Sequence, residues 1–149
     1  MPPIHLKFLF LKGFSKFEFA ELMKGENFEK VYRHGKYLFV KMDDKQIMMH
    51  FGMTGYLKET EDETPEHTKI VFEIEDGCKI AYVNIRKLGI LKMIKSIKDF
   101  IGRENIGKDA LDMTKKEFNA FMESKRGSIK SALMDQENIA GIGNIYSDE

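Results

Sequence analysis

Cysteine and long apolar runs are nearly absent from the sequence. Cys78 is the one cysteine, which excludes a disulfide within the chain and a zinc site made of cysteines, and it fits a strand residue in a reducing cytoplasm. No apolar run approaches the roughly 20 residues that a membrane-spanning helix needs. Residues 1–12 hold a short apolar stretch broken by Lys7 and no signal-peptide cleavage site. We therefore expect a cytoplasmic protein without a membrane segment.

Common catalytic and metal-binding groups are also missing. No pair of carboxylates and no set of serine, histidine and aspartate stands out in the sequence. The histidines show no spacing typical of metal ligands; they are His5, His34, His50 and His67. The sequence therefore predicts no metal site.

The charge is balanced in number but not in position. The chain has 24 basic and 24 acidic residues, which by itself argues weakly against a nucleic-acid partner. However, residues 86–98 hold five basic side chains and no acidic one, and acidic residues gather at 59–66 and 73–76. Such segregation can give a neutral protein one positive face, although a solvated surface with chance clustering is the alternative. A second basic cluster holds Lys125, Arg126 and Lys130.

The first part of the chain, residues 1–95, reads as β-rich. Ser15 to Glu18 forms a capping box that opens a short helix, and Gly25 favours a stop just after it. From Phe28 the apolar residues follow a period of two, so we expect an antiparallel meander folded into a sandwich or barrel-like unit. The expected strands are Tyr37–Met42, Ile47–Phe51, Thr68–Glu75, Lys79–Val83 and Leu88–Met93.

The second part, residues 96–149, reads as helical. Helices are expected over 96–102, from the capping box at Thr114–Glu117, and over 129–134. A glycine-rich turn, Gly141-Ile142-Gly143, precedes a last helix. The fold class is therefore α+β, with an antiparallel β-sandwich followed by a helical domain.

The segment from Ile139 to Tyr146 has the strongest local signal. Two glycines one residue apart allow a tight turn, and their backbone N–H groups can approach a ligand closely. Such a turn before a helix suits a phosphate oxygen, and Asn144 can add a side-chain donor. An ordinary connection between two helices is the alternative.

Two further segments suggest contact with a base stack. His50-Phe51-Gly52-Met53-Thr54-Gly55 can present Met53 as an apolar wedge of the kind that prises bases apart. Arg86 and Leu88 stand two apart on an extended segment, so they point the same way and could fill the hole left by an extruded base. The ordinary alternatives are a core methionine, a structural His50 and an exposed arginine beside a core leucine. Lys36, at a strand start, is ordinarily a surface lysine.

Together these segments resemble the formamidopyrimidine-DNA glycosylase and endonuclease VIII family. The resemblance runs from about residue 25 to the last residue, and its final segment includes the family's helix–two-turn–helix signature. The segments that carry it are Gly35-Lys36-Tyr37-Leu38, His50 to Gly55, Arg86-Lys87-Leu88-Gly89, and Leu133 to Gln136 through Gly141 to Tyr146.

The resemblance implies a β-sandwich of the family's N-terminal catalytic type joined to a helix–two-turn–helix DNA-binding domain. Damaged double-stranded DNA would lie in the cleft between them, and no protein partner or membrane is implied. The implied activity is excision of oxidised bases by a DNA glycosylase that also cleaves abasic sites as a lyase. Such a protein would work at the nucleoid if its source is prokaryotic.

The resemblance also assigns roles to residues. Lys36 matches the catalytic lysine beside the lesion, which assists proton transfer and phosphate binding. Met53, Arg86 and Leu88 match the trio that fills the vacated stack, where the family often has phenylalanine in place of Leu88. His50 would contact the DNA backbone near the lesion. The remaining DNA contacts are His67, Lys125 and Asn144, which match phosphate-binding positions, and Lys130 in the same helical stretch.

The sequence departs from the family at both ends. The family begins Met-Pro-Glu-Leu-Pro-Glu, and its N-terminal proline attacks the sugar, whereas this chain begins Met1-Pro2-Pro3-Ile4-His5. We interpret Pro2 as an internal residue uncovered by truncation, and Leu6–Leu11 as a strand. The chain stops inside the signature helix. The family's zinc finger, its lesion-gripping loop and its phosphate-clamping arginine would lie beyond, so both domains are expected to be incomplete and no cofactor is expected.

Three hypotheses remain open at this point. The chain can represent a bifunctional glycosylase and lyase, a catalytically inactive DNA-binding module that keeps the same cleft, or another nucleic-acid-binding protein that shares the helix–two-turn–helix unit, as a ribosomal protein might. The motifs of the β-rich part argue against the third hypothesis.

Overall fold

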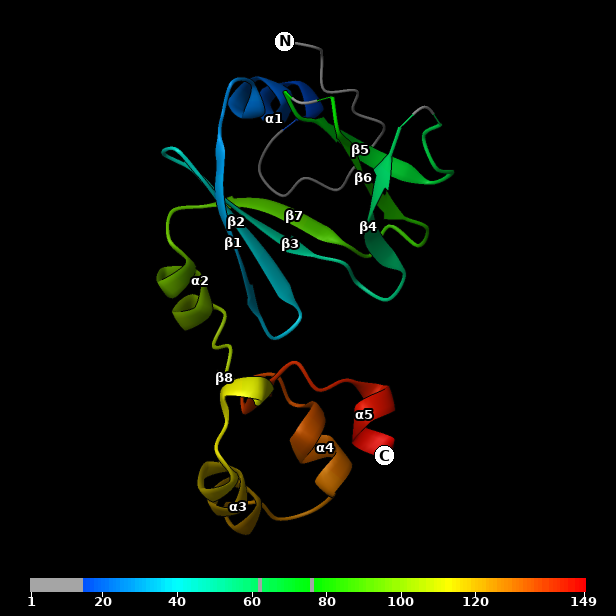
Figure 1. The fold of residues 1–149 in the computed structure, drawn as a ribbon. Coiled ribbons are helices and arrows are strands. Elements are labelled where there is room, and N and C mark those ends of the chain that lie inside the picture. Colours follow the sequence, from blue (N-terminus) through cyan, green and yellow to red (C-terminus); the bar gives the residue numbers. More distant parts are fainter. Residues whose placement is uncertain (1–14, 62, 76) are drawn as a thin grey trace. The chain divides into compact units, whose positions relative to one another are not determined.

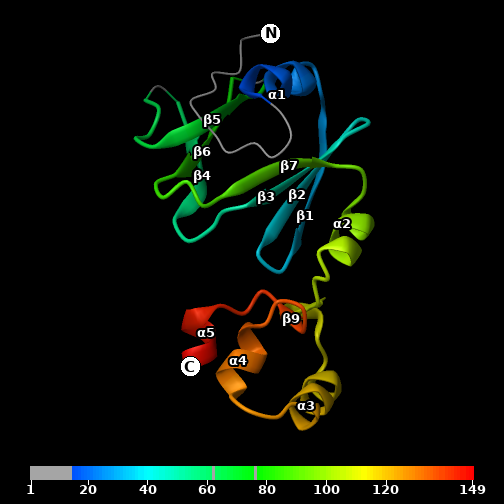
Figure 2. The same ribbon diagram turned by 180° about the vertical axis from the view of Figure 1, so that it is seen from behind.

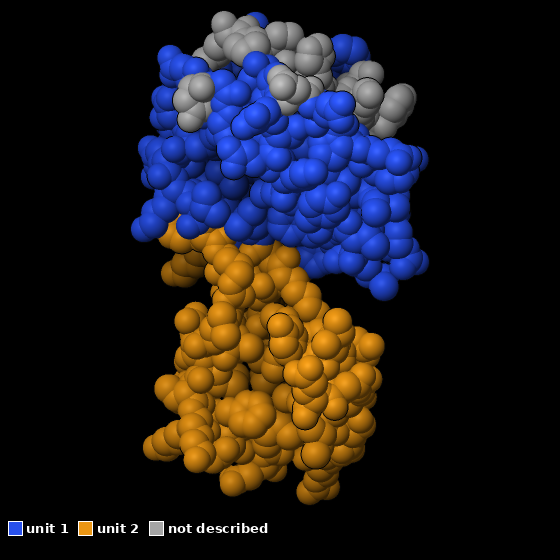
Figure 3. Space-filling view, turned by 45° about the vertical axis from the view of Figure 1, so that its right-hand side comes forward, with its two compact units in different colours: residues 1–31, 38–94 blue, residues 32–37, 95–149 orange. Residues whose placement is uncertain are grey.

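The computed structural model describes residues 15–61, 63–75 and 77–149 (Figure 1; seen from behind in Figure 2). The chain forms two compact units, coloured separately in Figure 3. One contains residues 1–31 and 38–94, and the other contains residues 32–37 and 95–149. Residues 32–37, which lie within the β-rich part of the sequence, thus group with the helical unit. The strand expected at Leu6–Leu11 and the candidate nucleophile Pro2 lie outside the described residues.

The short helix α1, Lys16–Met23, begins as the capping box predicts. The Ser15 side chain accepts from the Glu18 N–H, and the Glu18 carboxylate accepts from the Ser15 N–H at 2.7 Å. These reciprocal bonds satisfy two of the backbone donors that a helix start leaves unpaired. The helix buries Phe19 and Met23 in the core of the β-rich unit.

The strands form a four-stranded and a three-stranded sheet (Figure 1). The order β1-β2-β3-β7 contains Phe28–His34, Tyr37–Met42, Gln46–His50 and Ile90–Ile94. The order β4-β6-β5 contains Gly55–Thr60, Lys79–Asn84 and Thr68–Glu73. The strands β3 and β7, β4 and β6, and β5 and β6 pair antiparallel. The predicted antiparallel sandwich is confirmed.

The predicted meander is wrong in its connections. β6 and β7 follow one another in the sequence but belong to different sheets: β7 pairs with β3, and β6 pairs with β4. A period of two in the sequence identifies the buried face of a strand but not the strand that it pairs with. The sequence therefore did not indicate that β6 and β7 belong to different sheets. β4 was not anticipated because most of its side chains are exposed, which hides the alternation.

The core lies between the two sheets and is closed by α1. Its side chains come from both sheets and from the helix, so neither sheet buries its apolar face alone. Each fully buried side chain of this size contributes roughly 1.5–3 kcal/mol to folding. The core residues are Phe19, Met23, Val40, Met42, Ile47, Met49, Ile70, Phe72, Tyr82 and Leu91.

The helical unit contains the expected helices and one small unexpected sheet. The helices are α2 Ile97–Arg103, α3 Lys115–Ser124, α4 Ile129–Met134 and α5 Asn144–Asp148, with a 3-10 turn, η1, at Ala110–Asp112. The side chains of Ser96, Thr114 and Ser128 cap α2, α3 and α4. The capping box predicted at Thr114 is confirmed. Two short parallel strands, β8 Lys108–Asp109 and β9 Ile139–Ala140, join the middle of the unit to its last part.

None of the helices in the described ranges combines the length and apolarity that a membrane crossing requires.

Candidate functional site

Lys36 lies in the tight turn between β1 and β2, with an exposed side chain. The preceding Gly35 has φ +57°, a left-handed conformation that side chains disfavour. A Cβ on Gly35 would lie 2.7 Å from the Cβ of Ala140 in β9. Glycine therefore lets this turn pack directly against β9, within the helical unit.

A buried carboxylate holds the turn in place. Asp109 in β8 is 2% exposed, and its Oδ2 accepts from the Gly35 N–H at 2.6 Å. The Arg33 guanidinium reaches both carboxylate oxygens, with Nη2 3.0 Å from Oδ1 and Nη1 2.8 Å from Oδ2. Arg33 Nη1 also donates to the Gly35 carbonyl at 2.9 Å. Asp109 thus fixes both the N–H of the residue before Lys36 and the arginine that holds its carbonyl.

The pKa of Asp109 follows from these contacts. Burial by itself raises the pKa of the carboxyl, but hydrogen bonds from Arg33, Gly35 and Leu111, together with the charge of Arg33, outweigh burial and hold the pKa below its usual value of 3.8. A carboxyl group whose pKa is depressed by folding stabilises the folded state above its unfolded-state pKa. That stabilisation is lost as the pH falls through the folded-state pKa.

Sequence reasoning missed Asp109. The local signal was its place as N-cap of η1, where its Oδ1 accepts from the Leu111 N–H at 2.9 Å. An aspartate in such a turn is ordinarily satisfied by its own backbone, so this signal says nothing of Arg33 or Gly35.

The Lys36 ammonium lies beside the glycine-rich turn. A Cβ on Gly143 would be 3.4 Å from Lys36 Nζ, so Lys36 lies against the residue that precedes Asn144. Gln136 secures the turn by accepting from the Gly141 N–H at 3.0 Å and donating to the Ile142 carbonyl at 2.8 Å. The structure therefore brings an exposed ammonium close to a turn that carries an exposed amide side chain. Both are donors of the kind that contact phosphate oxygens.

The two other predicted lysines of this unit have protein partners. Lys125 Nζ donates to Asn138 Oδ1 at 2.7 Å and lies 5.1 Å from the centre of the Phe121 ring. Lys130 Nζ lies 2.5 Å from a carboxylate oxygen of Asp148. Both partners of this ion pair are exposed, so it is worth little and an incoming phosphate can compete with Asp148.

In the β-rich unit, two loops pack against each other. We call them the wedge loops: residues 51–55, between β3 and β4, and residues 85–89, between β6 and β7. The Arg86 N–H donates to Thr54 Oγ1 at 3.3 Å, and Arg86 Nη1 donates to the Met53 sulfur at 3.4 Å. A Cβ on Gly52 would lie 2.9 Å from the backbone of Leu88. The structure thus brings Met53, Arg86 and Leu88 together.

The side chains at the tips of the wedge loops are exposed rather than buried. Met53 is 75% exposed and Leu88 is 51% exposed. The alternatives of a core methionine and a core leucine are therefore wrong for these positions.

A buried polar pair in β6 anchors the wedge loops where they leave the sheets. Asn84 and Tyr82, in β6, are 1% and 0% exposed. Asn84 Nδ2 donates to the Phe51 carbonyl at 3.3 Å and to Tyr82 Oη at 3.0 Å, and Tyr82 Oη donates to the His50 carbonyl at 3.4 Å. A Cβ on Gly89 would lie 1.8 Å from Tyr82 Oη, so only glycine fits beside this pair at position 89.

Sequence reasoning did not single out Tyr82 or Asn84. Two polar groups at alternate positions of an otherwise apolar strand, Ile80 to Asn84, were the available signal. Such groups are costly to bury without partners, which is why they point to a buried network.

The two predicted histidines flank the wedge loops. His50 ends β3, and its Nδ1 lies 3.2 Å from the Gly52 N–H. His67 has φ +63° and an exposed side chain 3.4 Å from Glu66, and its carbonyl accepts from the Asn84 N–H at 3.2 Å. Both therefore adjoin the network around Asn84.

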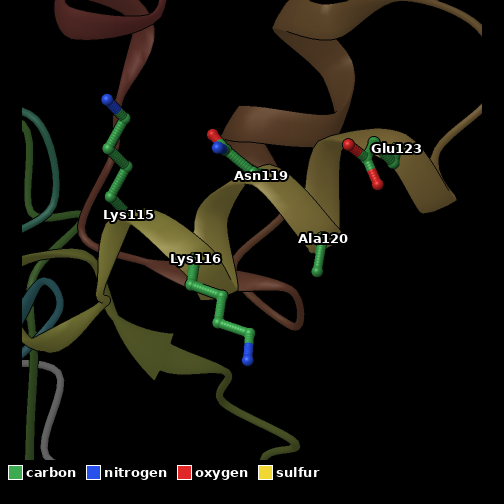
Figure 4. A pocket seen from close by; sticks show the side chains of 5 residues that line it. All are labelled: Lys115, Lys116, Asn119, Ala120 and Glu123. Carbon is green, nitrogen blue, oxygen red and sulfur yellow. The ribbon is translucent and has the colours of Figure 1, made fainter.

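One hollow of the surface lies outside these groups. It runs along α3 and is lined by Lys115, Lys116, Asn119, Ala120 and Glu123. Figure 4 shows Lys115 and Lys116 pointing in opposite directions, so their charges do not converge on one ligand. No three His, Cys, Asp or Glu side chains among the described residues are grouped to hold a metal ion.

Comparison with known proteins identifies the family of both units. Residues 5–91 match the formamidopyrimidine-DNA glycosylase N-terminal domain, and residues 102–149 match the formamidopyrimidine-DNA glycosylase H2TH domain, the helix–two-turn–helix unit.

This chain belongs to the formamidopyrimidine-DNA glycosylase family.

Curated relatives agree with this assignment. The chain is 31% identical over 139 residues to a formamidopyrimidine-DNA glycosylase of Ligilactobacillus salivarius, covering 89% of this chain and 50% of that protein. It is 32% identical over 144 residues to one of Heliobacterium modesticaldum, covering 88% and 51%. The chain therefore spans about half the length of the curated relatives it matches.

Solved structures of the family share the fold. A Lactococcus lactis enzyme, solved in complex with DNA containing an abasic site, superposes with a TM-score of 0.85 at 22% identity, covering 99% of this chain and 56% of that one. Its complex with DNA containing the formamidopyrimidine lesion FAPY-dG gives a TM-score of 0.83. The family inferred from the motifs is confirmed, whereas the roles of the individual site residues stay predictions.

Replacing Gly89 should disrupt the base of the wedge loops. Gly89→Ala places a Cβ on the Tyr82 hydroxyl, and we expect a loss of roughly 1–3 kcal/mol in the free energy of unfolding, as for other overpacked sites. Chemical denaturation followed by circular dichroism measures it. Gly102→Ala, where nothing lies within 4 Å of the new Cβ, is the control and should be neutral or stabilising by up to about 1 kcal/mol. Equal effects of the two variants would contradict the anchoring contact.

Replacing Asp109 should loosen the Lys36 turn in a pH-dependent way. At pH 7 we expect Asp109→Asn to lower the free energy of unfolding by roughly 1–3 kcal/mol. The loss is kept this small because solvent screens the half-exposed Arg33. Amide hydrogen exchange at Gly35 should be faster in the variant, and the difference should shrink as the pH falls below 3.8, the usual pKa of the carboxyl, and through the lower pKa of folded Asp109. Asp112→Asn removes the same charge from an exposed position and serves as the control. A pH-independent difference would refute the charge-based clamp.

Proposed function

We propose that the protein repairs DNA by excising oxidised bases, as a DNA glycosylase with lyase activity at abasic sites. The observation that carries this proposal is the grouping of Met53, Arg86 and Leu88 on two interlocked loops with exposed tips. Related enzymes of the family have been solved on DNA with an abasic site and with a formamidopyrimidine lesion, which supports damaged duplex DNA as the substrate.

The wedge loops are suited to replace an extruded base. Met53 and Leu88 are apolar and exposed, and such side chains can enter a base stack in place of a lost base. The Arg86 guanidinium, beside the Met53 sulfur, can donate to the edge of the unpaired partner base. Extrusion costs a few kcal/mol and least for damaged bases, so a preformed wedge favours lesions.

The Lys36 turn is suited to hold the sugar-phosphate backbone at the lesion. Its ammonium is exposed on a turn that Asp109 fixes, and it lies against Gly143. In this proposal Lys36 assists proton transfer at the lesion and, with Asn144, binds a phosphate. Further phosphate contacts are assigned to His50, His67, Lys125 and Lys130.

An amine nucleophile is the remaining requirement of lyase chemistry. A proline nitrogen of low pKa can attack the C1′ carbon of the sugar, release the base and form an iminium that leads to strand cleavage. Pro2 is the candidate in this sequence only after removal of Met1, which would turn its amide nitrogen into a secondary amine. The proposal also assigns the protein to the cytoplasm, at the nucleoid if the source is prokaryotic. The chemistry requires no cofactor.

Affinity for DNA tests the binding part of the proposal. We expect tighter binding to a duplex with one abasic site than to the undamaged duplex, and an affinity that falls steeply with salt. Lys36→Ala should reduce the slope of log affinity against log salt by about 1 unit. Lys116→Ala, which removes an exposed lysine of α3 with no assigned DNA contact, should leave the slope unchanged. Fluorescence anisotropy at several salt concentrations measures both, and equal slopes for the two variants would remove Lys36 from the interface.

Trapping with borohydride tests the chemical part. Reduction of the iminium on an abasic-site duplex should give a covalent protein–DNA adduct, which Pro2→Gly should abolish. Lys36→Ala should slow base excision by roughly 10²–10⁴-fold, as for loss of a general acid or base. Lesion-selective binding without any adduct would mean that the chain is a DNA-binding module that keeps the interface without the chemistry.

A further inference from the structure

Met53 differs from the other described methionines in its access to solvent. Met23, Met42, Met48 and Met49 are buried in the core, whereas Met53 is 75% exposed. Among the described methionines, Met134 has the next most exposed side chain, at 37%. Because oxidation of a thioether depends on access of the oxidant, we expect a peroxide to reach Met53 first among the described methionines.

Oxidation of Met53 would change its contact with Arg86. Arg86 Nη1 lies 3.4 Å from it. A thioether sulfur is a weak hydrogen-bond acceptor, whereas a sulfoxide oxygen is polar and accepts strongly. Oxidation would therefore make the wedge polar and bind the Arg86 guanidinium to it. Both effects oppose insertion into a base stack.

We propose that Met53 is a modification site for hydrogen peroxide, and that its sulfoxide weakens the recognition of damaged DNA by the wedge loops. A sulfur lone pair attacks one peroxide oxygen, so that a sulfur–oxygen bond forms while the oxygen–oxygen bond breaks. The sulfur is oxidised by two electrons. The leaving hydroxide takes the proton of the transferred oxygen and becomes water, which completes the reduction of the peroxide.

The scaffold of the wedge loops survives this modification. Its contacts are the Arg86 N–H to Thr54, the Asn84 side chain to the Phe51 carbonyl, and the close approach of Gly52 to Leu88. None of them uses the Met53 sulfur. Oxidation of Met53 thus changes the tip of the wedge while the fold is kept, unlike oxidation of a core methionine.

The experiment treats the full chain with hydrogen peroxide for increasing times. Peptide mass spectrometry follows each methionine, and anisotropy follows binding to an abasic-site duplex and to the undamaged duplex. We expect Met53 to gain oxygen before Met134, with affinity for the abasic-site duplex falling ~10-fold in step. Affinity for the undamaged duplex should stay constant, and methionine sulfoxide reductase should restore the loss.

Two variants make the result specific. Met53→Leu, compared with its own untreated sample, should lose no affinity on peroxide treatment. Met134→Leu should lose affinity as the unmodified sequence does. Equal peroxide sensitivity with and without Met53, or full affinity after complete oxidation of Met53, would overturn the proposal.

The inference rests on the proposed function of the wedge loops, and the same data separate the two. An untreated protein that shows no preference for the abasic-site duplex would refute the proposed function, and the consequence assigned to Met53 with it. A preference that persists after Met53 is oxidised would refute the inference alone.

Discussion

The position of Lys36 depends on the hydrogen bonds of one buried carboxylate, that of Asp109. A tight turn on a hairpin has few contacts of its own, and a lysine at its tip would sample many positions. Here the carboxylate accepts from the Gly35 N–H and from both terminal guanidinium nitrogens of Arg33, Nη1 and Nη2. A buried charge is tolerable only when its hydrogen-bonding capacity is filled in this way. The same contacts that lower the pKa of Asp109 therefore fix the backbone one residue before the lysine.

The wedge loops use neutral groups for a comparable purpose. Asn84 and Tyr82 bind backbone carbonyls at the base of one loop, while Gly89 of the other passes against their polar atoms. Fixed loop bases leave the tips free to expose apolar side chains without burying backbone polar groups. This division between a rigid base and an exposed tip suits a side chain that has to enter a base stack with little loss of its own freedom.

Local patterns account for much of the fold and for part of the candidate site. The capping boxes at Ser15 and Thr114 predicted where α1 and α3 begin, because cap and helix lie within four residues. The exposed strand β4 was missed, and the placing of β6 and β7 in different sheets contradicts the expected meander. Both failures concern tertiary neighbours, which a period of two does not encode.

The sequence by itself determined the family, because the motifs around Lys36, Met53, Arg86 and Asn144 occur together and in order, and the last of them is long enough to be specific. It also determined the β-rich and helical character of the two parts, which local periodicity and caps carry. Only the tertiary structure decided which residues support these motifs. Asp109 lies 74 residues from Gly35, and Asn84 lies 33 residues from Phe51. A hydrogen bond across such a separation leaves no local pattern, since its partners meet only after both elements have packed.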